Sequence, residues 1–299
     1  MNVLTLIISY NFEPWMDRCL HSLAASKHPT DVLVIDNAST DRTAERMKKE
    51  YPAVRFLQNG RNLGFGGANN IGLRMALAEG YDAVFLLNQD AWIDADTLGT
   101  LGALSARHPD YGILSPVHLD GSGRQPDPGF AAYTGRTSKE AFATLSEELV
   151  ERPFINAAFW WMPVRTLRTV GGFSPLFYHY GEDKDYVNRL HYHGLKVGYS
   201  PRVFGCHDRA FRRPDRAAFF RTEQVYHLSE YANPNYPAGR AFAYGPLAAL
   251  KKAAAALTHG QGNDTLAYLR IARTLLGQSR QVRQVRQTLL HPQPHFIQP

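Results

Sequence analysis

Short apolar runs alternate with helical patterns along the first part of the chain. Four runs have the length of buried strands and lie at residues 3–9, 31–35, 54–57 and 83–87. Apolar residues at helical spacing follow the first run and the third, at Met16, Cys19, Leu20 and Leu23 and at Ala68, Ile71, Met75 and Ala78. Strands that alternate with helices predict right-handed crossovers and an α/β fold with a mostly parallel sheet.

Polar residues follow each of these four strands. Ligands of an open α/β sheet bind beyond the carboxyl ends of its strands, so these residues are expected to line one site. Tyr10 offers a ring that can stack on a base, and Asp36 a carboxylate for a base N–H or ribose hydroxyls. A glycine-rich turn at 59–70 permits close approach to a ligand, and Asp90 is placed to hold a divalent cation against phosphates. Each could be an ordinary turn alone, but four in succession predict a nucleotide site.

The second half of the chain continues the pattern less regularly. Strands are expected at 111–114 and 154–162, and the latter contains Trp160 and Trp161. These tryptophans are expected in the core, with stacking on a sugar as the alternative. The segment 120–135 is rich in Gly, Pro and Asp without periodicity, so it is expected to be a loop.

Several short motifs lie at the strand ends and at the start of one later helix. They are Ile8-Ser9-Tyr10-Asn11, Val34-Ile35-Asp36-Asn37-Ala38-Ser39-Thr40-Asp41, Asn62-Leu63-Gly64-Phe65-Gly66-Gly67-Ala68-Asn69-Asn70, Leu86-Leu87-Asn88-Gln89-Asp90, Gly171-Gly172-Phe173 and Glu182-Asp183. In order and spacing they resemble the motifs of the family-2 inverting glycosyltransferases, most closely the bacterial rhamnosyltransferase-like branch. The resemblance covers about the first 210 residues. It implies a GT-A fold, a nucleotide-sugar donor and a divalent cation, Mg²⁺ or Mn²⁺.

The resemblance also assigns roles to residues. It implies that Asp183 is the general base for the acceptor hydroxyl, with Glu182 beside it, although such carboxylates can simply favour the positive end of a helix. The cation is assigned to Asp90 and His207, because Asn88 stands where the family usually has a carboxylate and an amide is a poorer metal ligand. The nucleotide sugar is assigned to Tyr10, Asn11, Asp36, Asn62, Gly64, Gly67, Asn88 and Gln89.

The net charge of +6 belongs to the C-terminal part of the chain. From Arg240 onward there are eight Lys or Arg and one acid, Asp264, whereas the preceding residues are close to neutral. A nucleic-acid enzyme would spread its cations over the main groove, so nucleic acid is not an expected partner. Four arginines before this tail could contact a diphosphate or form a solvated surface: Arg209, Arg212, Arg213 and Arg216.

The basic tail is amphipathic. One helical face carries Ile271, Leu275, Val282, Val285 and Leu289. Such a face can lie on an anionic membrane, dock on its own protein or form a homodimer, and the sequence leaves these three open. The expected organisation is a GT-A domain at 1–215, with a nucleotide-sugar half at 1–110 and an acceptor half at 111–215, and a helical extension at 216–299.

Composition indicates the compartment. No stretch approaches the roughly 18 apolar residues of a membrane span, and the N-terminus lacks the pattern of a secretory signal. Two cysteines, Cys19 and Cys206, are expected to be reduced thiols. The expected location is cytoplasmic, with peripheral contact to the inner face of the membrane as an option.

The sequence therefore predicts a metal-dependent, inverting glycosyltransferase. It would move rhamnose or another hexose from a dTDP- or UDP-sugar to a saccharide or lipid-linked acceptor in cell-surface polysaccharide synthesis. One alternative is a nucleotidyltransferase that forms sugar nucleotides, although the Gly-rich run with Lys or Arg expected after its first strand is missing. The other is a non-catalytic nucleotide-sugar-binding protein in which Asn88 marks a decayed metal site.

Overall fold

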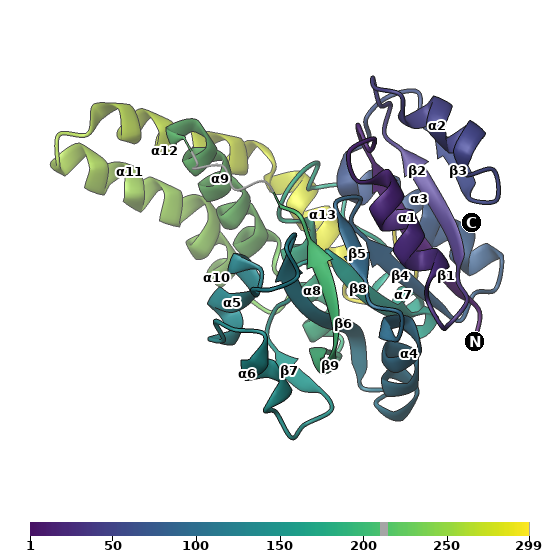
Figure 1. The fold of residues 1–299 in the computed structure, drawn as a ribbon. Helices are drawn as coiled ribbons and strands as arrows, with labels where there is room; N and C mark the ends of the chain where they lie inside the picture. Colours follow the sequence, from purple (N-terminus) through teal and green to yellow (C-terminus); the bar gives the residue numbers. More distant parts are fainter. Residues whose placement is uncertain (210–214, 299) are drawn as a thin grey trace.

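A computed structural model describes residues 1–209 and 215–298 of the protein. Within them, a nine-stranded sheet has the order β3-β2-β1-β4-β8-β6-β9-β5, and β7 also pairs with β9 (Figure 1). The strands are β1 (Val3–Ser9), β2 (Asp31–Asp36), β3 (Arg55–Gln58), β4 (Ala83–Leu87), β5 (Ala91–Ile93), β6 (Tyr111–Asp120), β7 (Val150–Arg152), β8 (Phe159–Pro163) and β9 (Lys196–His207). The helices are α1 (Met16–Ala24), α2 (Thr43–Glu50), α3 (Gly64–Ala78), α4 (Thr97–Arg107), α5 (Pro128–Thr134), α6 (Glu140–Ala143), α7 (Val164–Val170), α8 (Glu182–Tyr192), α9 (Arg216–Ala232), α10 (Ala238–Phe242), the π-helix η1 (Ala243–Leu247), α11 (Ala248–Thr258), α12 (Gly262–Gly277) and α13 (Ser279–Thr288).

The first four strands pair in parallel, as predicted. β1 lies between β2 and β4, and β3 pairs with β2. The unbroken apolar sequences of β1 and β4 are buried because helices cover both faces of the sheet. One apolar core lies beneath α3, and a second lies beneath α1, α2 and α4. This arrangement confirms the predicted α/β fold and aligns the carboxyl ends of these strands at one edge.

The glycine-rich segment is largely helical, because α3 begins at Gly64. Its buried face is centred on Leu73, whereas Ala78, which was expected on that face, is exposed. The reason is a close approach at Gly72, where a Cβ atom would lie 2.5 Å from the Leu6 side chain of β1. Because Gly72 has no side chain, this side of α3 packs directly against the sheet. The predicted apolar face of this helix is therefore partly wrong.

The second half makes the sheet mixed rather than mostly parallel. β8 runs antiparallel between β4 and β6, and β5 and β7 run antiparallel to β9. Apolar runs do not encode strand direction, so the sequence could not reveal this. Trp160 and Trp161 of β8 are fully buried in the two cores, which confirms the core interpretation and excludes stacking on a sugar. The expected loop at 120–135 contains α5, because Asp127 caps this helix and Pro128 begins it.

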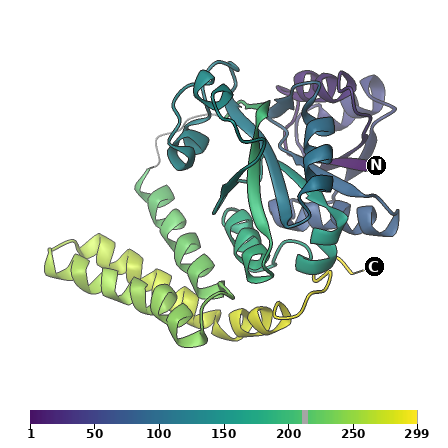
Figure 2. The ribbon, with the colours of Figure 1, turned by 90° about the horizontal axis from the view of Figure 1, so that it is seen from below.

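The C-terminal helices enclose a third apolar core. Figures 1 and 2 show α11 and α12 side by side as a hairpin, far from β3. The predicted amphipathic face is buried in this core: Ile271, Leu275, Val282, Val285 and Leu289. That face therefore docks on the protein itself and is divided between α12 and α13. In the described part of the chain, no helix combines the length and the apolar character that a membrane crossing requires.

Candidate active site

Two adjoining cavities lie beyond the carboxyl ends of β1, β2 and β4. The first cavity, of about 410 Å³, is lined by these strand ends and by the start of α3. The second cavity, of about 790 Å³, reaches the end of β9 and the starts of α8 and α9. Both are lined by Phe65, Asn88, Asp90 and His179, so they form one cleft. The cleft lies at the sheet edge where the sequence predicts a ligand.

Hydrogen bonds between Tyr10 and Gln89 connect the ends of β1 and β4. The Tyr10 N–H donates to Gln89 Oε1 at 2.7 Å, and Gln89 Nε2 donates to the Tyr10 carbonyl at 3.0 Å. The Tyr10 side chain is left 47% exposed beside the first cavity, where its ring can stack on a base. Asn11 does not line the cavity. It adopts a left-handed φ of +56°, and its Oδ1 accepts a hydrogen bond from the Thr40 N–H at 2.9 Å.

Asp36 lies behind the wall of the cleft. It is fully buried, and its carboxylate accepts hydrogen bonds from Ser9 Oγ at 3.0 Å, the Ser39 N–H at 3.0 Å and Gln58 Nε2 at 3.1 Å. A direct contact with a nucleotide would require some of these bonds to open. In this structure the carboxylate instead holds the loop after β2 in place.

Asn37 and the glycine-rich segment form one side of the first cavity. Asn37 Nδ2 donates to the Gly64 carbonyl at 3.2 Å, and Asn62 Oδ1 accepts from the Gly64 N–H at 2.8 Å. Gly64 has a φ of +74°, and a Cβ atom there would lie 2.0 Å from the Tyr178 carbonyl oxygen, so this position requires glycine. Gly67 is exposed and lines neither cavity. Asn37 was not predicted as a binding residue. Its position directly after Asp36, the acid that ends β2, is the feature that could have identified it.

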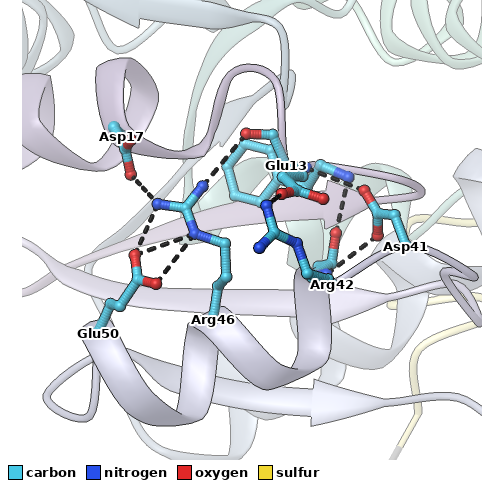
Figure 3. Close-up of polar contacts among 8 residues, drawn as sticks. Glu13, Asp17, Asp41, Arg42, Arg46 and Glu50 are labelled. Carbon is cyan, nitrogen blue, oxygen red and sulfur yellow. Dashed lines mark hydrogen bonds and ion pairs between the residues drawn. The ribbon is translucent and has the colours of Figure 1, made fainter.

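A polar network joins the loops that follow β1 and β2 (Figure 3). Arg46 of α2 donates to Asp17 of α1 at 2.7 Å, and Arg42 pairs with Glu13. Asp41 accepts from the Glu13 N–H at 3.2 Å, which closes the link between the two loops. Each exposed pair contributes little alone, but together they fix the loops that carry one wall of the first cavity.

Asp90 and His207 meet although they lie far apart in the sequence. β5 pairs antiparallel with β9 and sets Ala91 opposite His207, which leaves Asp90 Oδ1 3.2 Å from His207 Nε2. Asn88 Nδ2 lies 3.4 Å from the same ring nitrogen. His207 is buried, and its Nδ1 has no hydrogen-bond partner among the described residues. The three predicted residues thus come together where the two cavities join.

Glu182 and Asp183 form the first turn of α8 and line the second cavity. Burial, followed by the charge of Asp183, raises the pKa of Glu182 to about 7. Burial also raises the pKa of Asp183, opposed by backbone hydrogen bonds and by the Arg209 charge. Both carboxyls therefore hold their protons to a higher pH than exposed carboxyls do. Asp185, by contrast, is held in a buried ion pair with Arg189 at 2.8 Å.

Arg209 and Arg221 are cations that line the second cavity. Arg209 is one of the four arginines for which the sequence leaves phosphate contact and a solvated surface open, and Arg221 of α9 belongs to no motif in the sequence. Arg216 instead pairs with the single acid of α12 and lines a different cavity. Arg212 and Arg213 lie outside the described residues.

Relatives of known activity resemble the chain in sequence. Residues 5–165 match the profile of Glycosyl transferase family 2. The N-acetylglucosaminyl-diphospho-decaprenol L-rhamnosyltransferase of Mycobacterium tuberculosis is 29% identical over 229 residues, which cover 68% of this chain and 75% of that one. The undecaprenyl-phosphate mannosyltransferase of Micrococcus luteus is 37% identical over 93 residues, 30% of this chain and 38% of that one.

Solved structures resemble the chain in fold. S. aureus TarS 1-349 in complex with UDP has a TM-score of 0.55 at 15% identity, covering 97% of this chain and 90% of that one. GalNAc-T7 with UDP, GalNAc and Mn²⁺ has a TM-score of 0.58 at 14% identity, covering 84% of this chain and 54% of that one. These likenesses confirm the GT-A fold. Since the family profile matches more than half of the residues and includes the strand-end motifs of the cleft, the chain belongs to glycosyl transferase family 2.

Proposed function

We propose that the protein is an inverting, metal-dependent glycosyltransferase in which Asp183 deprotonates the acceptor hydroxyl. The observation that carries this proposal is the single cleft lined by Asp90, His207, Glu182 and Asp183. A nucleotide in the first cavity would direct its diphosphate toward Asp90 and its sugar toward the second cavity. The acceptor would then enter beside α8.

The proposed chemistry is one direct displacement. The acceptor hydroxyl attacks the anomeric carbon from the face opposite the nucleoside diphosphate, and its proton passes to Asp183 as the bond to the leaving group breaks. Burial raises the pKa of Asp183, so its carboxylate accepts a proton more readily than that of an ordinary aspartate. The pKa of Glu182 is about 7, so below that pH this side chain is mostly protonated and uncharged. It then adds little electrostatic repulsion at Asp183.

The residues at the junction of the two cavities fit a divalent cation. Asp90 Oδ1 and His207 Nε2 are 3.2 Å apart, close to the roughly 3 Å between adjacent ligands of an octahedral ion with bonds of about 2.1 Å. Asn88 would add an oxygen if its amide were turned over, a choice that hydrogen-bonding partners decide. No group of three or more His, Cys, Asp or Glu that could hold an ion occurs among the described residues, so donor phosphates and water would supply the remaining ligands. Such an ion would neutralise the charge that develops on the departing diphosphate.

The donor and acceptor follow from the relatives. The Mycobacterium tuberculosis protein is named for transfer of L-rhamnose to a diphospho-linked lipid saccharide. We propose the same classes here: rhamnose from dTDP-rhamnose, or another hexose from a UDP-sugar, moved to a lipid-linked acceptor in cell-surface glycan synthesis. Tyr10, Asn37, Asn62, Gly64 and Gln89 would hold the nucleotide. The enzyme would work on the cytoplasmic side of a membrane.

Donor release measured with a panel of nucleotide sugars tests this function. The purified protein should release a nucleoside diphosphate from one donor when acceptor and Mn²⁺ or Mg²⁺ are present, and chelation should stop the release. Asp90→Ala and His207→Ala should each weaken cation-dependent stabilisation by the donor in thermal-shift assays. If no nucleoside diphosphate or nucleotide sugar stabilises the protein, the donor assignment is wrong.

The same panel separates the alternatives. A nucleotidyltransferase would release pyrophosphate from a nucleoside triphosphate and a sugar phosphate. A non-catalytic binder would bind the donor in calorimetry and turn over none of the acceptors. Membership of glycosyl transferase family 2 supports transfer over both of these outcomes.

A further inference from the structure

The exposed leucines lie in the C-terminal part of the chain. Within the described residues, the most exposed leucines all lie between positions 247 and 290. Leu257, near the turn of the α11–α12 hairpin, is 65% exposed. The members on η1, α11 and α12 are Leu247, Leu250, Leu257, Leu266, Leu269 and Leu276. Large exposed apolar patches on soluble proteins mark surfaces that bind a partner or a membrane.

Leu257 and Leu266 lie on the sides of α11 and α12 that face away from α9. Lys252 of α11 and Tyr268 of α12 both contact Glu223 of α9, which identifies the inner side of each helix. At 100° per residue, Leu257 lies about 140° around α11 from Lys252, and Leu266 lies about 160° around α12 from Tyr268. Figures 1 and 2 show the two helices as the outermost layer of the C-terminal part. The exposed face is therefore distinct from the buried amphipathic face that the sequence predicts.

The C-terminal helices also carry exposed cations. The ion pairs of the described residues include none for the exposed cations Lys251, Arg270, Arg273, Arg280 and Arg283. The acid Asp264 pairs with Arg216 and is mostly buried, so it does not neutralise them. Two copies that met through this face would bring like charges together. Anionic lipid headgroups would instead attract these cations while the leucines enter the boundary with the acyl chains.

The position of α9 connects this face to the catalytic cleft. Ala218 and Arg221 of α9 line the second cavity, whereas Phe219 lines a cavity of about 680 Å³ shared with α11 and α12. Asp215, at the start of α9, lines both cavities. A helix with its side chains is about 10 Å thick, so only about one helix separates the cleft from the hairpin.

We infer that the outer face of the α11–α12 hairpin docks on an anionic phospholipid bilayer. Among the described residues, the exposed leucines and unpaired cations on and beside this hairpin are Leu247, Leu250, Lys251, Leu257, Leu266, Leu269, Arg270, Arg273 and Leu276. Docking there would hold the second cavity about two helix layers, roughly 20 Å, from the membrane surface, on the side from which a lipid-linked acceptor would approach. The role of docking in reaching a lipid-linked acceptor rests on the proposed function. Binding of the protein to the bilayer does not depend on that function.

Sedimentation with vesicles tests the inference on the full-length protein. Wild type should sediment with vesicles of equal parts phosphatidylglycerol and phosphatidylcholine, and far less with phosphatidylcholine alone. The variant Leu257→Gln/Leu266→Gln/Leu269→Gln should bind at least about tenfold more weakly. The variant Arg270→Gln/Arg273→Gln should lose about fivefold per charge removed. Leu290→Gln is the matched control, because Leu290 is 44% exposed but lies beyond α13, and its binding should equal that of wild type.

Three results would overturn the inference. The first is wild-type protein that does not sediment with anionic vesicles. The second is a triple-leucine variant that has the circular dichroism of the wild type and binds vesicles equally well. The third is a wild type that forms dimers which the same substitutions convert to monomers. Transfer to a water-soluble acceptor separates docking from the proposed function. It should be unchanged in the triple-leucine variant, and its absence in wild type would refute the transferase proposal without affecting the vesicle result.

Discussion

Glu182 should make the folded protein less stable as the pH rises. Its pKa is raised from 4.5 to about 7, first by burial and then by the charge of Asp183. Between these two values the folded state keeps a proton that the unfolded state has lost, so the free energy of unfolding falls as the pH rises. Each pKa unit corresponds to about 1.4 kcal/mol, which gives a loss of about 3 kcal/mol from this one carboxyl across the window.

The substitution Glu182→Gln removes that titration and keeps the shape of the side chain. We expect the variant to gain about 3 kcal/mol relative to wild type on going from pH 4.5 to pH 8, as measured by urea denaturation at both pH values. Glu140→Gln, an exposed glutamate on α6, reports the effect of removing a carboxyl outside the cleft. A stability difference between Glu182→Gln and wild type that is the same at both pH values would show that burial does not raise this pKa.

Three further substitutions test the cleft. Asp183→Asn should lower the transfer rate by about 10² to 10⁴ while nucleoside diphosphate binding in calorimetry is unchanged, and near-normal transfer would remove the role of base. Asp90→Ala should weaken Mn²⁺-dependent donor binding at least about tenfold, and equal binding with and without the cation in wild type would contradict this. Gly64→Ala should lower the free energy of unfolding by at least about 2 kcal/mol, because its Cβ atom would meet the Tyr178 carbonyl at 2.0 Å. Its control Gly67→Ala, whose nearest neighbour would be 3.4 Å away, should leave the protein as stable or slightly more stable in thermal melts.

The local signals in the sequence were strongest where one segment determines its own structure. The apolar runs that became β1, β2 and β4 are buried on both faces, so they needed no partner to be recognised. Residues at the ends of these strands were expected at one edge because parallel strands share their direction. Tyr10, Asn88, Gln89 and Asp90 do lie in the cleft, as that rule requires.

Contacts between distant segments decided what local patterns could not. Asp36 ends a strand as the rule requires, yet hydrogen bonds from Ser9, Ser39 and Gln58 hold its carboxylate away from the cleft. The apolar face shared by α12 and α13 is compatible with a membrane, a partner or its own protein, since helical periodicity specifies an apolar face but not what covers it.

The sequence by itself determined the α/β class, the strands of the nucleotide half and the identity of the chemical groups. Tertiary structure alone decided that the end of β9 returns His207 to Asp90, and that the helical tail buries one apolar face and exposes another. The physical reason is that periodicity and strand ends are properties of a few neighbouring residues. The meeting of two side chains across a sheet depends on the pairing and direction of every strand between them.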